Sequence, residues 1–403
     1  MINRRKVLQR LVSLPVLGTV FGGAAAGAAA STATVVTRDY FQELGLRTFI
    51  NAAGTLTFLS GSLMPDEVAQ AIDYARNHYV RLDEIQDRVG ERIAELLGCE
   101  YATVTSGAFS AMTLSIAGVM CGMDQKKVEQ LPDTTGLKNE VIVLKPENPI
   151  GYVHALTNAG AKVIEVQTRA ELENAITDRT AMLFVFNAYN GSEVSLEELV
   201  EVGKKHGIPT FNDAAADVPP VENLWKYTKM GFDLVAFSGG KGIKGPQSAG
   251  LLLGRKDLIT AARLHTPPRG ETIGRGMKVN KEEVLAMLVA LELYVAKDHK
   301  VEWALWESQI EQIKDAVEGV SGTETEIHVP EVANHTPTLR VKWDQNRVHI
   351  SPADAKLRLQ QGHPSIETGG GSEEISISVW MMRPGEERIV ARRLRDVLSE
   401  AST

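Results

Sequence analysis

Short apolar runs alternate with amphipathic stretches through the middle of the chain. The apolar runs have the length of strands, and they predict strands at Val141–Leu144, Lys162–Val166, Ala181–Phe186, Pro209–Asn212 and Leu234–Phe237. The stretches between them have helical spacing. This alternation favours an α/β fold in which helices cover a mostly parallel sheet.

The pattern differs on either side of this body. Residues 65–97 predict two helices with apolar stripes, and residues 281–317 have one long helical pattern. A small α+β lobe is predicted by short strands at Glu326–Val329, Thr338–Trp343 and Ile375–Val379 and by a charged helix over 384–399. We therefore expect an N-terminal arm at 31–64, a large domain at 65–270, and a hinge, long helix and small C-terminal domain at 271–403.

One glycine-rich turn, Ser238–Lys241, joins the apolar run that ends at Phe237 to a second run at Ala249–Gly254. Lysine is seldom buried without a partner, but a desolvated amine has a lowered pKa and forms a Schiff base with a carbonyl. Lys241 is therefore a candidate for the lysine that carries pyridoxal 5′-phosphate (PLP). A solvated lysine in a surface turn is the alternative that this stretch leaves open.

A carboxylate precedes this turn in the chain. Asp213 follows the run Pro209–Asn212 and is itself followed by three alanines. A buried carboxylate needs a cationic partner, and the pyridine nitrogen of PLP is such a partner, because an Asp there keeps the ring an electron sink. The alanines, Ala215 among them, leave room for a flat ring. The alternative is that Asp213 caps the next helix, and Asp217 can be interpreted as only such a cap.

A Thr-Ser-Gly turn before an apolar helix predicts an anion site. Ser106, Gly107 and Ala108 stand where that helix begins, and free N–H groups and a hydroxyl at a helix N-terminus suit a phosphate. Because any serine can cap a helix, the argument depends on the order along the chain: phosphate turn, carboxylate, lysine. Ser238 is a candidate for a further hydrogen bond to the phosphate.

These stretches, together with Ile50–Thr57, Gly245–Gln247 and Gly274–Lys278, resemble the selenocysteine-synthase-like group of fold-type-I PLP-dependent enzymes from about residue 38 onward. The group includes L-seryl-tRNA(Sec) selenium transferase and D-glucosaminate-6-phosphate ammonia-lyase. The resemblance implies the fold-type-I architecture, Lys241 as the lysine of the internal aldimine, Asp213 as the pyridine partner, and Ser106, Gly107 and Ala108 as the phosphate cup. It also implies at least a homodimer, because related enzymes complete each site with a second subunit.

Four candidate substrate-binding residues come from two segments. Asn51 and Thr55 lie in the N-terminal arm, a segment that borders the active site in related enzymes. Tyr152 or His154 is a candidate to stack on the pyridine ring, as an aromatic group does in related enzymes. The alternative is that Tyr152 packs in the core and that His154 caps or packs.

Two further polar residues are candidates for the same role. Asn187 follows a predicted strand and can reach the phenolic oxygen of the cofactor or the substrate, although Asn-Gly at 190–191 is equally a plain turn signal. Arg275 lies in a Pro/Gly/Arg loop, His265–Met277, which we interpret as the hinge. A bidentate guanidinium suits an anionic substrate group or the cofactor phosphate, and an exposed hinge arginine is the alternative.

The expected activity is that of a PLP-dependent lyase or transferase acting on an amino acid or amino-sugar acid. Lys241, once free, moves protons as general base and acid, and loss of a β-leaving group followed by loss of ammonia is α,β-elimination of the ammonia-lyase type. Selenium-transferase-like β-replacement, racemisation and aldol cleavage use the same groups, because PLP sets the range of reactions and the pocket chooses among them. An exported binding protein with this fold is the non-enzymatic alternative.

Residues 1–30 predict export. The pair Arg4–Arg5 precedes an apolar stretch from Leu11 to Ala30 that ends in small residues, a pattern typical of a twin-arginine signal. An amphipathic N-terminal helix and an uncleaved anchor are alternatives. We expect a periplasmic or exported protein, or a cytoplasmic one if the signal does not function, with no stable membrane span in the mature chain.

The net charge and the cysteine content argue against certain binding partners and cofactors. The net charge is −8, and the only charged residues in 1–30 are basic, so the remainder is still more acidic. An acidic body repels polyanions, which argues against a nucleic-acid partner. Cys99 and Cys121 provide neither a disulfide framework nor a metal site.

Overall fold

The computed structural model describes residues 38–402, so the predicted export signal at 1–30 and the first part of the predicted arm lie outside the described residues. The chain divides into two compact units, Met1–Arg47 and Thr48–Thr403. In the described part of the first unit, the helix α2 (Tyr40–Glu43) is capped by Asp39, whose side chain accepts a hydrogen bond from the Gln42 N–H at 2.9 Å. The remaining elements belong to the second unit.

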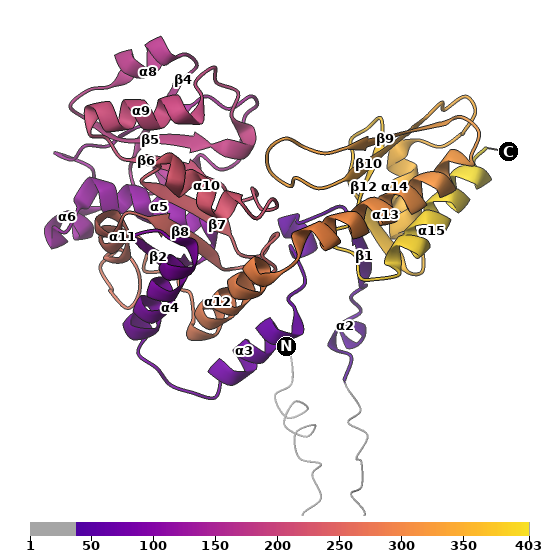
Figure 1. Ribbon diagram of the computed structural model, residues 1–403, viewed down its shortest axis with the longest axis horizontal. Helices are drawn as coiled ribbons and strands as arrows, with labels where there is room; N and C mark the ends of the chain where they lie inside the picture. The colour runs from indigo at the N-terminus through magenta and orange to yellow at the C-terminus, as the bar shows by residue number, and fades with distance from the viewer. Residues whose placement is uncertain (1–37, 403) are drawn as a thin grey trace, which may run out of the picture. The chain divides into compact units, whose positions relative to one another are not determined.

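Within the described residues, seven strands form one sheet in the order β2-β8-β7-β6-β5-β3-β4 (Figure 1). They are β2 (Tyr101–Thr105), β3 (Glu140–Leu144), β4 (Lys162–Val166), β5 (Thr180–Phe186), β6 (Thr210–Asp213), β7 (Leu234–Ser238) and β8 (Gly250–Gly254). The pairs from β4 to β7 are parallel, and β8 runs antiparallel to both β2 and β7. The predicted α/β fold with a mostly parallel sheet is confirmed.

Helices cover both faces of this sheet. They are α3 (Asp66–Ala75), α4 (Leu82–Leu97), α5 (Gly107–Cys121), α6 (Gln125–Gln130), α7 (His154–Thr157), α8 (Arg169–Ala175), α9 (Leu196–His206), α10 (Asn223–Met230), α11 (Lys256–Arg263) and α12 (Lys281–Ala296). Ile142 and Leu144 of β3 join one core cluster with α4, α9 and α12, while Val141 and Val143 join a second with α5 and α11. Alternate side chains of a strand therefore face opposite cores, as expected of a sheet buried on both sides.

The C-terminal part has its own core around two smaller sheets. Among the described residues these are an antiparallel sheet in the order β12-β10-β9 and a parallel pair, β1-β11. The elements are β1 (Phe49–Ala52), β9 (Thr323–His328), β10 (Thr338–Trp343), β11 (Ser365–Thr368), β12 (Ile375–Ser378), α13 (His299–Glu318), α14 (Pro352–Gln360) and α15 (Glu386–Glu400). Ile50 and Ala52 of β1 are buried in this core. Part of the predicted N-terminal arm is thus a strand of the C-terminal lobe.

The predicted long helix at 281–317 is wrong as a single element. The chain leaves helical geometry at Lys297, and Asp298 starts α13 by accepting hydrogen bonds from the N–H groups of Lys300 and Val301. Buried residues of α12 belong to a core of the large sheet, whereas those of α13 belong to the C-terminal core. The boundary between these two cores therefore lies at 297–298, within the segment 271–403 that was predicted to contain the hinge, the long helix and the small domain.

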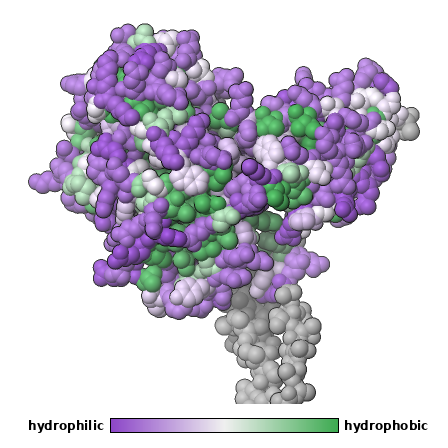
Figure 2. Space-filling view, in the orientation of Figure 1, coloured by the Kyte–Doolittle hydropathy of each residue, from purple (hydrophilic) through white to green (hydrophobic). Residues whose placement is uncertain are grey.

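The surface in view is largely hydrophilic, with hydrophobic residues gathered in a few places (Figure 2). Several large hydrophobic side chains that follow β1 are exposed, namely Leu56, Phe58, Leu63, Met64 and Tyr79. No helix in residues 38–402 is both long enough and apolar enough to cross a bilayer. The same residues contain no cluster of His, Cys, Asp or Glu suited to a metal ion.

Candidate active site

Lys241 lines a cavity of about 560 Å³. The other lining residues come from both the large-sheet part and the C-terminal part of the second unit. Its walls come from the loop after β1, the start of α5, the ends of β6 and β7, the loop before β10, and β12. The predicted residues that line it are Thr55, Gly107, Ala108, Tyr152, Asp213, Ala215, Ser238 and Lys241. The carboxyl ends of β6 and β7 supply Asp213 and Ser238, which is where α/β sheets bind ligands.

The turn that carries Lys241 is fixed by close backbone packing. A Cβ at Gly242 would lie 2.2 Å from the carbonyl oxygen of Val218, and one at Gly240 would lie 2.3 Å from the Cα of Gln247. Only glycine allows these approaches. Burial lowers the pKa of Lys241, and the carboxylates of Asp213 and Asp217 oppose that shift. The amine is therefore held away from water, yet it has two anionic neighbours.

Asp213 ends β6 and is 9% exposed. Its Oδ1 accepts a hydrogen bond from the Ala215 N–H at 3.1 Å. Burial raises the pKa of this carboxyl to about 6, while the charge of Lys241 acts in the opposite direction. A carboxylate that is buried to this degree is stabilised by a cation that comes with a ligand.

The turn from β2 into α5 presents a helix N-terminus to the cavity. Gly107 has a φ of +82°, which favours glycine, and Gly107 and Ala108 line the cavity with Phe109. The first N–H groups of a helix have no partner within the helix, so they suit an anion. Ser106 stands outside the cavity lining, and its hydroxyl donates to Ser110 Oγ at 2.9 Å.

These groups fit PLP. Asp213 provides the buried carboxylate for a pyridine nitrogen, and Lys241 provides the amine for an aldehyde. The start of α5 and Ser238 suit a phosphate, and the small side chain of Ala215 leaves space for a ring. Tyr152 and Tyr189 also line the cavity, with ring centroids 6.2 Å apart.

Besides Ser106, four predicted site residues lie outside the cavity lining. Asn51 shapes the loop that bears Thr55, because its Oδ1 accepts from the Ala53 and Gly54 N–H groups and its Nδ2 donates to the Gly54 carbonyl. His154 begins α7 and is exposed, and Arg275 is also exposed. Of the two residues predicted to stack on the pyridine ring, Tyr152 lines the cavity and His154 does not. Arg275 does not line the cavity either, so its role in binding an anion stays a prediction.

Asn187 belongs to a buried polar group next to the site. It begins η2 (Asn187–Tyr189), and its Nδ2 donates to Asp217 Oδ2 at 2.6 Å and to Tyr227 Oη at 3.0 Å. Tyr227 Oη donates to the same Asp217 oxygen at 2.8 Å. The interpretation of Asp217 as a helix cap is wrong: its side chain binds Asn187 and Tyr227, and α10 begins only at Asn223. The side-chain amide of Asn187 therefore donates to Asp217, whereas the sequence analysis predicted that Asn187 contacts the cofactor or the substrate.

Several lining residues were missed from the sequence. They come from the loop before β10, from β10 and β12, and from the segment after β12: Asn334, Thr336, Thr338, Ser376, Ser378 and Trp380. The predicted strands at Thr338–Trp343 and Ile375–Val379 contained a usable signal, because their polar positions alternate with apolar ones. That alternation shows a polar face, but it does not show which cavity the face meets.

The fold and the site together define a PLP-dependent enzyme of fold type I. The chain belongs to the L-seryl-tRNA selenium transferase (SelA) family, whose model matches residues 49–317. It is an enzyme, and its cofactor is pyridoxal 5′-phosphate. This confirms the cofactor and the family resemblance that the sequence predicted.

Relatives with known activities extend the match over nearly the whole chain. A D-glucosaminate-6-phosphate ammonia lyase of Salmonella typhimurium is 28% identical over 91% of this chain and 100% of its own length. A 5′-C-glycyluridine monooxygenase-decarboxylase of Streptomyces is 27% identical over 89% of the chain and 92% of its own. An L-seryl-tRNA(Sec) selenium transferase of Geotalea daltonii is 24% identical, and the match spans 58% of that enzyme's length.

Solved structures agree with this assignment. The structure of D-glucosaminate-6-phosphate ammonia-lyase superposes with a TM-score of 0.79 at 27% identity, covering 91% of this chain and 100% of that one. Serine palmitoyltransferase from S. paucimobilis with bound PLP gives a TM-score of 0.57 at 13% identity over 87% of each chain. At that identity the second match shows the shared fold alone.

Proposed function

We propose that this protein is an ammonia-lyase that acts by α,β-elimination on a 2-amino-3-hydroxy acid of the amino-sugar-acid type. One observation carries the proposal: a half-buried amine, Lys241, whose pKa burial lowers, shares a cavity with a buried carboxylate, Asp213. The end-to-end similarity to D-glucosaminate-6-phosphate ammonia lyase supports elimination as the reaction.

Bound PLP supplies the electron sink for a carbanion at C2 of the substrate. Lys241 is positioned to take the C2 proton, and its lowered pKa favours the neutral amine that a general base requires. The C3–O bond then breaks, and the hydroxyl leaves with a proton as water. Hydrolysis of the resulting enamine consumes one water and releases ammonia, so the net products are ammonia and a 2-oxo-3-deoxy acid.

Asp213 keeps the pyridine nitrogen protonated in this scheme, since its carboxylate is the buried anion opposite the lysine. Gly107 and Ala108, at the start of α5, would hold the phosphate through their backbone N–H groups. Tyr152 and Tyr189 line the same cavity and offer ring faces for packing against a bound ligand.

β-Replacement is the second candidate. It is supported by the family match and by the selenium transferases among the relatives, although those enzymes are matched over 58% of their length in one example. The net charge of −8 favours a small-molecule substrate over a nucleic acid. The two reactions differ in whether the leaving group is replaced by a nucleophile or ammonia is lost.

The decisive experiment incubates the PLP-loaded protein with D- and L-2-amino-3-hydroxy acids and amino-sugar acids, and measures ammonia and 2-oxo acid. We expect release in the ratio one to one, and a loss of at least about a thousandfold in Lys241→Ala. Lys244→Arg is the matched control. Lys244 lies three positions further along the same turn, and burial lowers the pKa of its amine as well. Equal losses in both variants, or no ammonia from any compound, would contradict the proposal.

We also propose that the protein is exported and acts as a homodimer. Arg4–Arg5 and the apolar stretch to Ala30 support export through a twin-arginine signal. The exposed side chains of Leu56, Phe58 and Leu63 near the cavity loop support a second subunit there, since exposed apolar clusters mark interaction sites. Cell fractionation of Arg4–Arg5→Lys–Lys against the unaltered chain tests the first, and light scattering of the Phe58→Glu variant tests the second.

A further inference from the structure

One face of the small antiparallel sheet is made of hydroxyl side chains. Thr338 of β10 is paired in register with Ser378 of β12, so the two side chains project from the same face. Ser376 lies two positions from Ser378 and shares that face. Leu339 and Ile377, on the opposite face, are buried in the C-terminal core. We call Thr338, Ser376 and Ser378 the hydroxyl wall.

The hydroxyl wall faces the cavity that contains Lys241. All three of its residues line that cavity. Trp380, which follows β12, lines it as well and is 3% exposed. The polar face of a sheet in the small lobe is therefore directed at the reaction centre of the large one.

Ser378 is the most informative member. It is 6% exposed, and its Oγ has no hydrogen-bond partner among residues 38–402. A buried hydroxyl without a partner is unfavourable, so a hydroxyl on a cavity wall gains when a ligand supplies that partner. Ser378 is thus suited to bind a ligand.

The neighbouring groups are also neutral and polar. Thr55, in the loop after β1, donates to Asn334 Oδ1 at 3.4 Å, and Thr55, Asn334 and Thr336 all line the cavity. Arg340, on the same face of β10, is held by Glu326 at 3.7 Å and by Glu374 at 3.9 Å. The polar side chains beside the hydroxyl wall therefore offer hydroxyls and an amide, and Trp380 adds an apolar ring.

We propose that the hydroxyl wall determines specificity by binding hydroxyl groups beyond C3 of the substrate, so that the substrate is a polyhydroxylated 2-amino acid. A hydroxyl both donates and accepts, so Ser and Thr match it in either sense. A site built to bind a substrate hydroxyl rejects an analogue that lacks it, because the buried groups of the site are then left unpaired. This inference rests on the proposed function, because that function places C2 of the substrate at Lys241. It concerns the binding of the substrate and not the reaction that follows.

The test compares two ligands that differ only in hydroxyls. D-Glucosaminate and D-norleucine share a six-carbon chain and the configuration at C2, and only the first carries hydroxyls on C3 to C6. Calorimetry uses the PLP-loaded protein carrying Lys241→Ala, in which the ligand is not consumed. We expect D-glucosaminate to bind at least about tenfold more tightly, and Ser378→Ala or Thr338→Val to reduce the preference to about threefold or less.

Ser115→Ala is the matched control. Ser115 is fully buried, its Oγ also lacks a partner in the described part of the chain, and it lies on α5 outside the cavity lining. We expect the preference to survive in this variant. An unchanged preference in Ser378→Ala, or an equal loss in Ser115→Ala, would overturn the proposal.

A second readout with intact Lys241 separates this inference from the proposed function. Ser378→Ala should raise KM for D-glucosaminate with little change in kcat, and should raise KM for D-serine, which has no hydroxyl beyond C3, by a much smaller factor. If no ammonia is released from any compound while the binding preference persists, elimination is the wrong reaction and the hydroxyl wall stands. If ammonia is released but the preference is absent, the hydroxyl wall is refuted and elimination stands.

Discussion

The side-chain amide of Asn187 and the carboxylate of Asp217 are joined by a hydrogen bond of 2.6 Å between Nδ2 and Oδ2. Asp217 is completely buried, and its other oxygen, Oδ1, has no hydrogen-bond partner within residues 38–402. Burial raises the pKa of Asp217, and the charge of Lys241 is among the interactions that oppose this shift. The site therefore contains a second carboxylate, beyond Asp213, that stabilises the ammonium form of Lys241.

Asp217→Asn should make the amine of Lys241 reactive at lower pH. The substitution removes a negative charge that favours the ammonium, while the amide can still accept from Asn187 and Tyr227, so the pKa of Lys241 falls further. The measurement is the fraction of PLP fixed on Lys241 by borohydride, starting from the cofactor-free protein, across a pH series. The midpoint should move to more acidic pH.

Tyr227→Phe is the control for that variant. It removes one donor to Asp217 Oδ2 but leaves the carboxylate and the hydrogen bond from Asn187 in place. We expect a smaller shift than in Asp217→Asn. Coincident midpoints for Asp217→Asn and the unaltered protein would mean that the charge of Asp217 does not act on Lys241.

Asp217 also illustrates what the sequence could and could not predict. Lys241, Asp213 and the Gly107 turn were predictable, because each combines an unusual residue with a local pattern that demands it: a glycine-rich turn, a strand end or a helix start. The role of Asp217 depends on Asn187 and Tyr227, which come from two other elements. No local pattern links residues that meet only when the sheet is assembled.

The same limit explains the errors in the fold. The strand pattern of the large sheet was readable because both faces are buried and the runs are almost wholly apolar. The break at Lys297–Asp298 was missed because apolar residues continue with helical spacing on both sides of it. The strand β1 was missed because four residues beside a Gly- and Thr-rich loop have little pattern of their own, and pairing with β11 decides their conformation.

Asp213→Asn should stabilise the cofactor-free protein at neutral pH while impairing the enzyme. Burial raises the folded-state pKa of Asp213 from its usual 3.8 to about 6. The folded state therefore binds the proton more tightly than the unfolded state, and this stabilisation is complete below pH 4 and lost as pH rises through about 6. At pH 8 the ionised, buried carboxylate costs at most about 3 kcal/mol.

Thermal unfolding of the cofactor-free protein at pH 4 and pH 8 checks this prediction. The Asn variant should unfold at a higher temperature than the unaltered chain at pH 8, with the difference shrinking at pH 4. Its rate of ammonia release with PLP bound should fall by about a hundredfold or more. A variant that is destabilised equally at both pH values would show that Asp213 is a structural residue whose ionisation does not oppose folding.

His265 should give the opposite dependence on pH. It is fully buried, and neither ring nitrogen forms a hydrogen bond of standard geometry within the described residues, although the backbone of Ala117 partly opposes the effect of burial on its pKa. Burial lowers its pKa from 6.5 to about 4. As pH falls, the histidine of the unfolded state is protonated before that of the folded state. The free energy of unfolding is therefore unaffected by this group above about pH 6.5 and decreases by about 3 kcal/mol as pH falls to 4.

Urea unfolding of His265→Leu tests that prediction. Between pH 7 and pH 4.5 the free energy of unfolding should fall less in the variant than in the unaltered chain. His154→Leu, at an exposed position in the first turn of α7, is the control and should keep the original pH dependence. Parallel curves for His265→Leu and the unaltered protein would contradict the buried, neutral imidazole.

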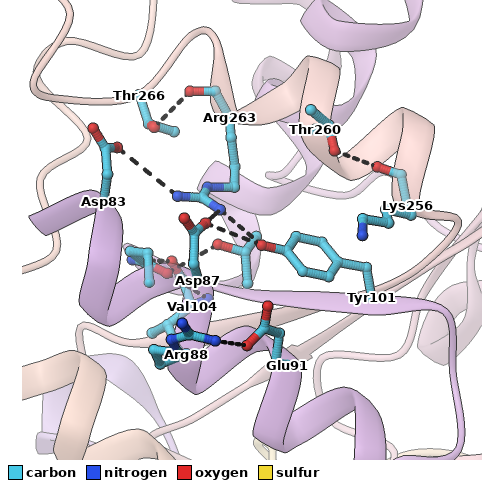
Figure 3. A network of polar contacts seen from close by, with 12 residues as sticks. Asp83, Asp87, Arg88, Glu91, Tyr101, Val104, Lys256, Thr260, Arg263 and Thr266 are labelled. Carbon is cyan, nitrogen blue, oxygen red and sulfur yellow. Dashed lines mark hydrogen bonds and ion pairs between the residues drawn. The ribbon is translucent and has the colours of Figure 1, made fainter.

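Arg263 should contribute to stability far more than the exposed arginine beside it. Its guanidinium, whose side chain is 15% exposed, bonds the carboxylate of Asp87 and donates to Tyr101 Oη at 2.9 Å, and that hydroxyl donates to Asp87 at 3.1 Å (Figure 3). These bonds tie the end of α11 to α4 and β2. In the same view Arg88 pairs with Glu91 at 2.9 Å, but their side chains are 83% and 55% exposed.

Arg263→Ala leaves Asp87 and Tyr101 without their shared donor, so we expect a loss of about 1–3 kcal/mol in the free energy of unfolding. Arg88→Ala breaks a solvated pair and should cost less than about 0.5 kcal/mol. Urea unfolding at low and high salt distinguishes the two, because added salt weakens the exposed pair more than the partly buried one. Similar losses in both variants would mean that the Arg263–Asp87–Tyr101 group stabilises the fold no more than a surface ion pair does.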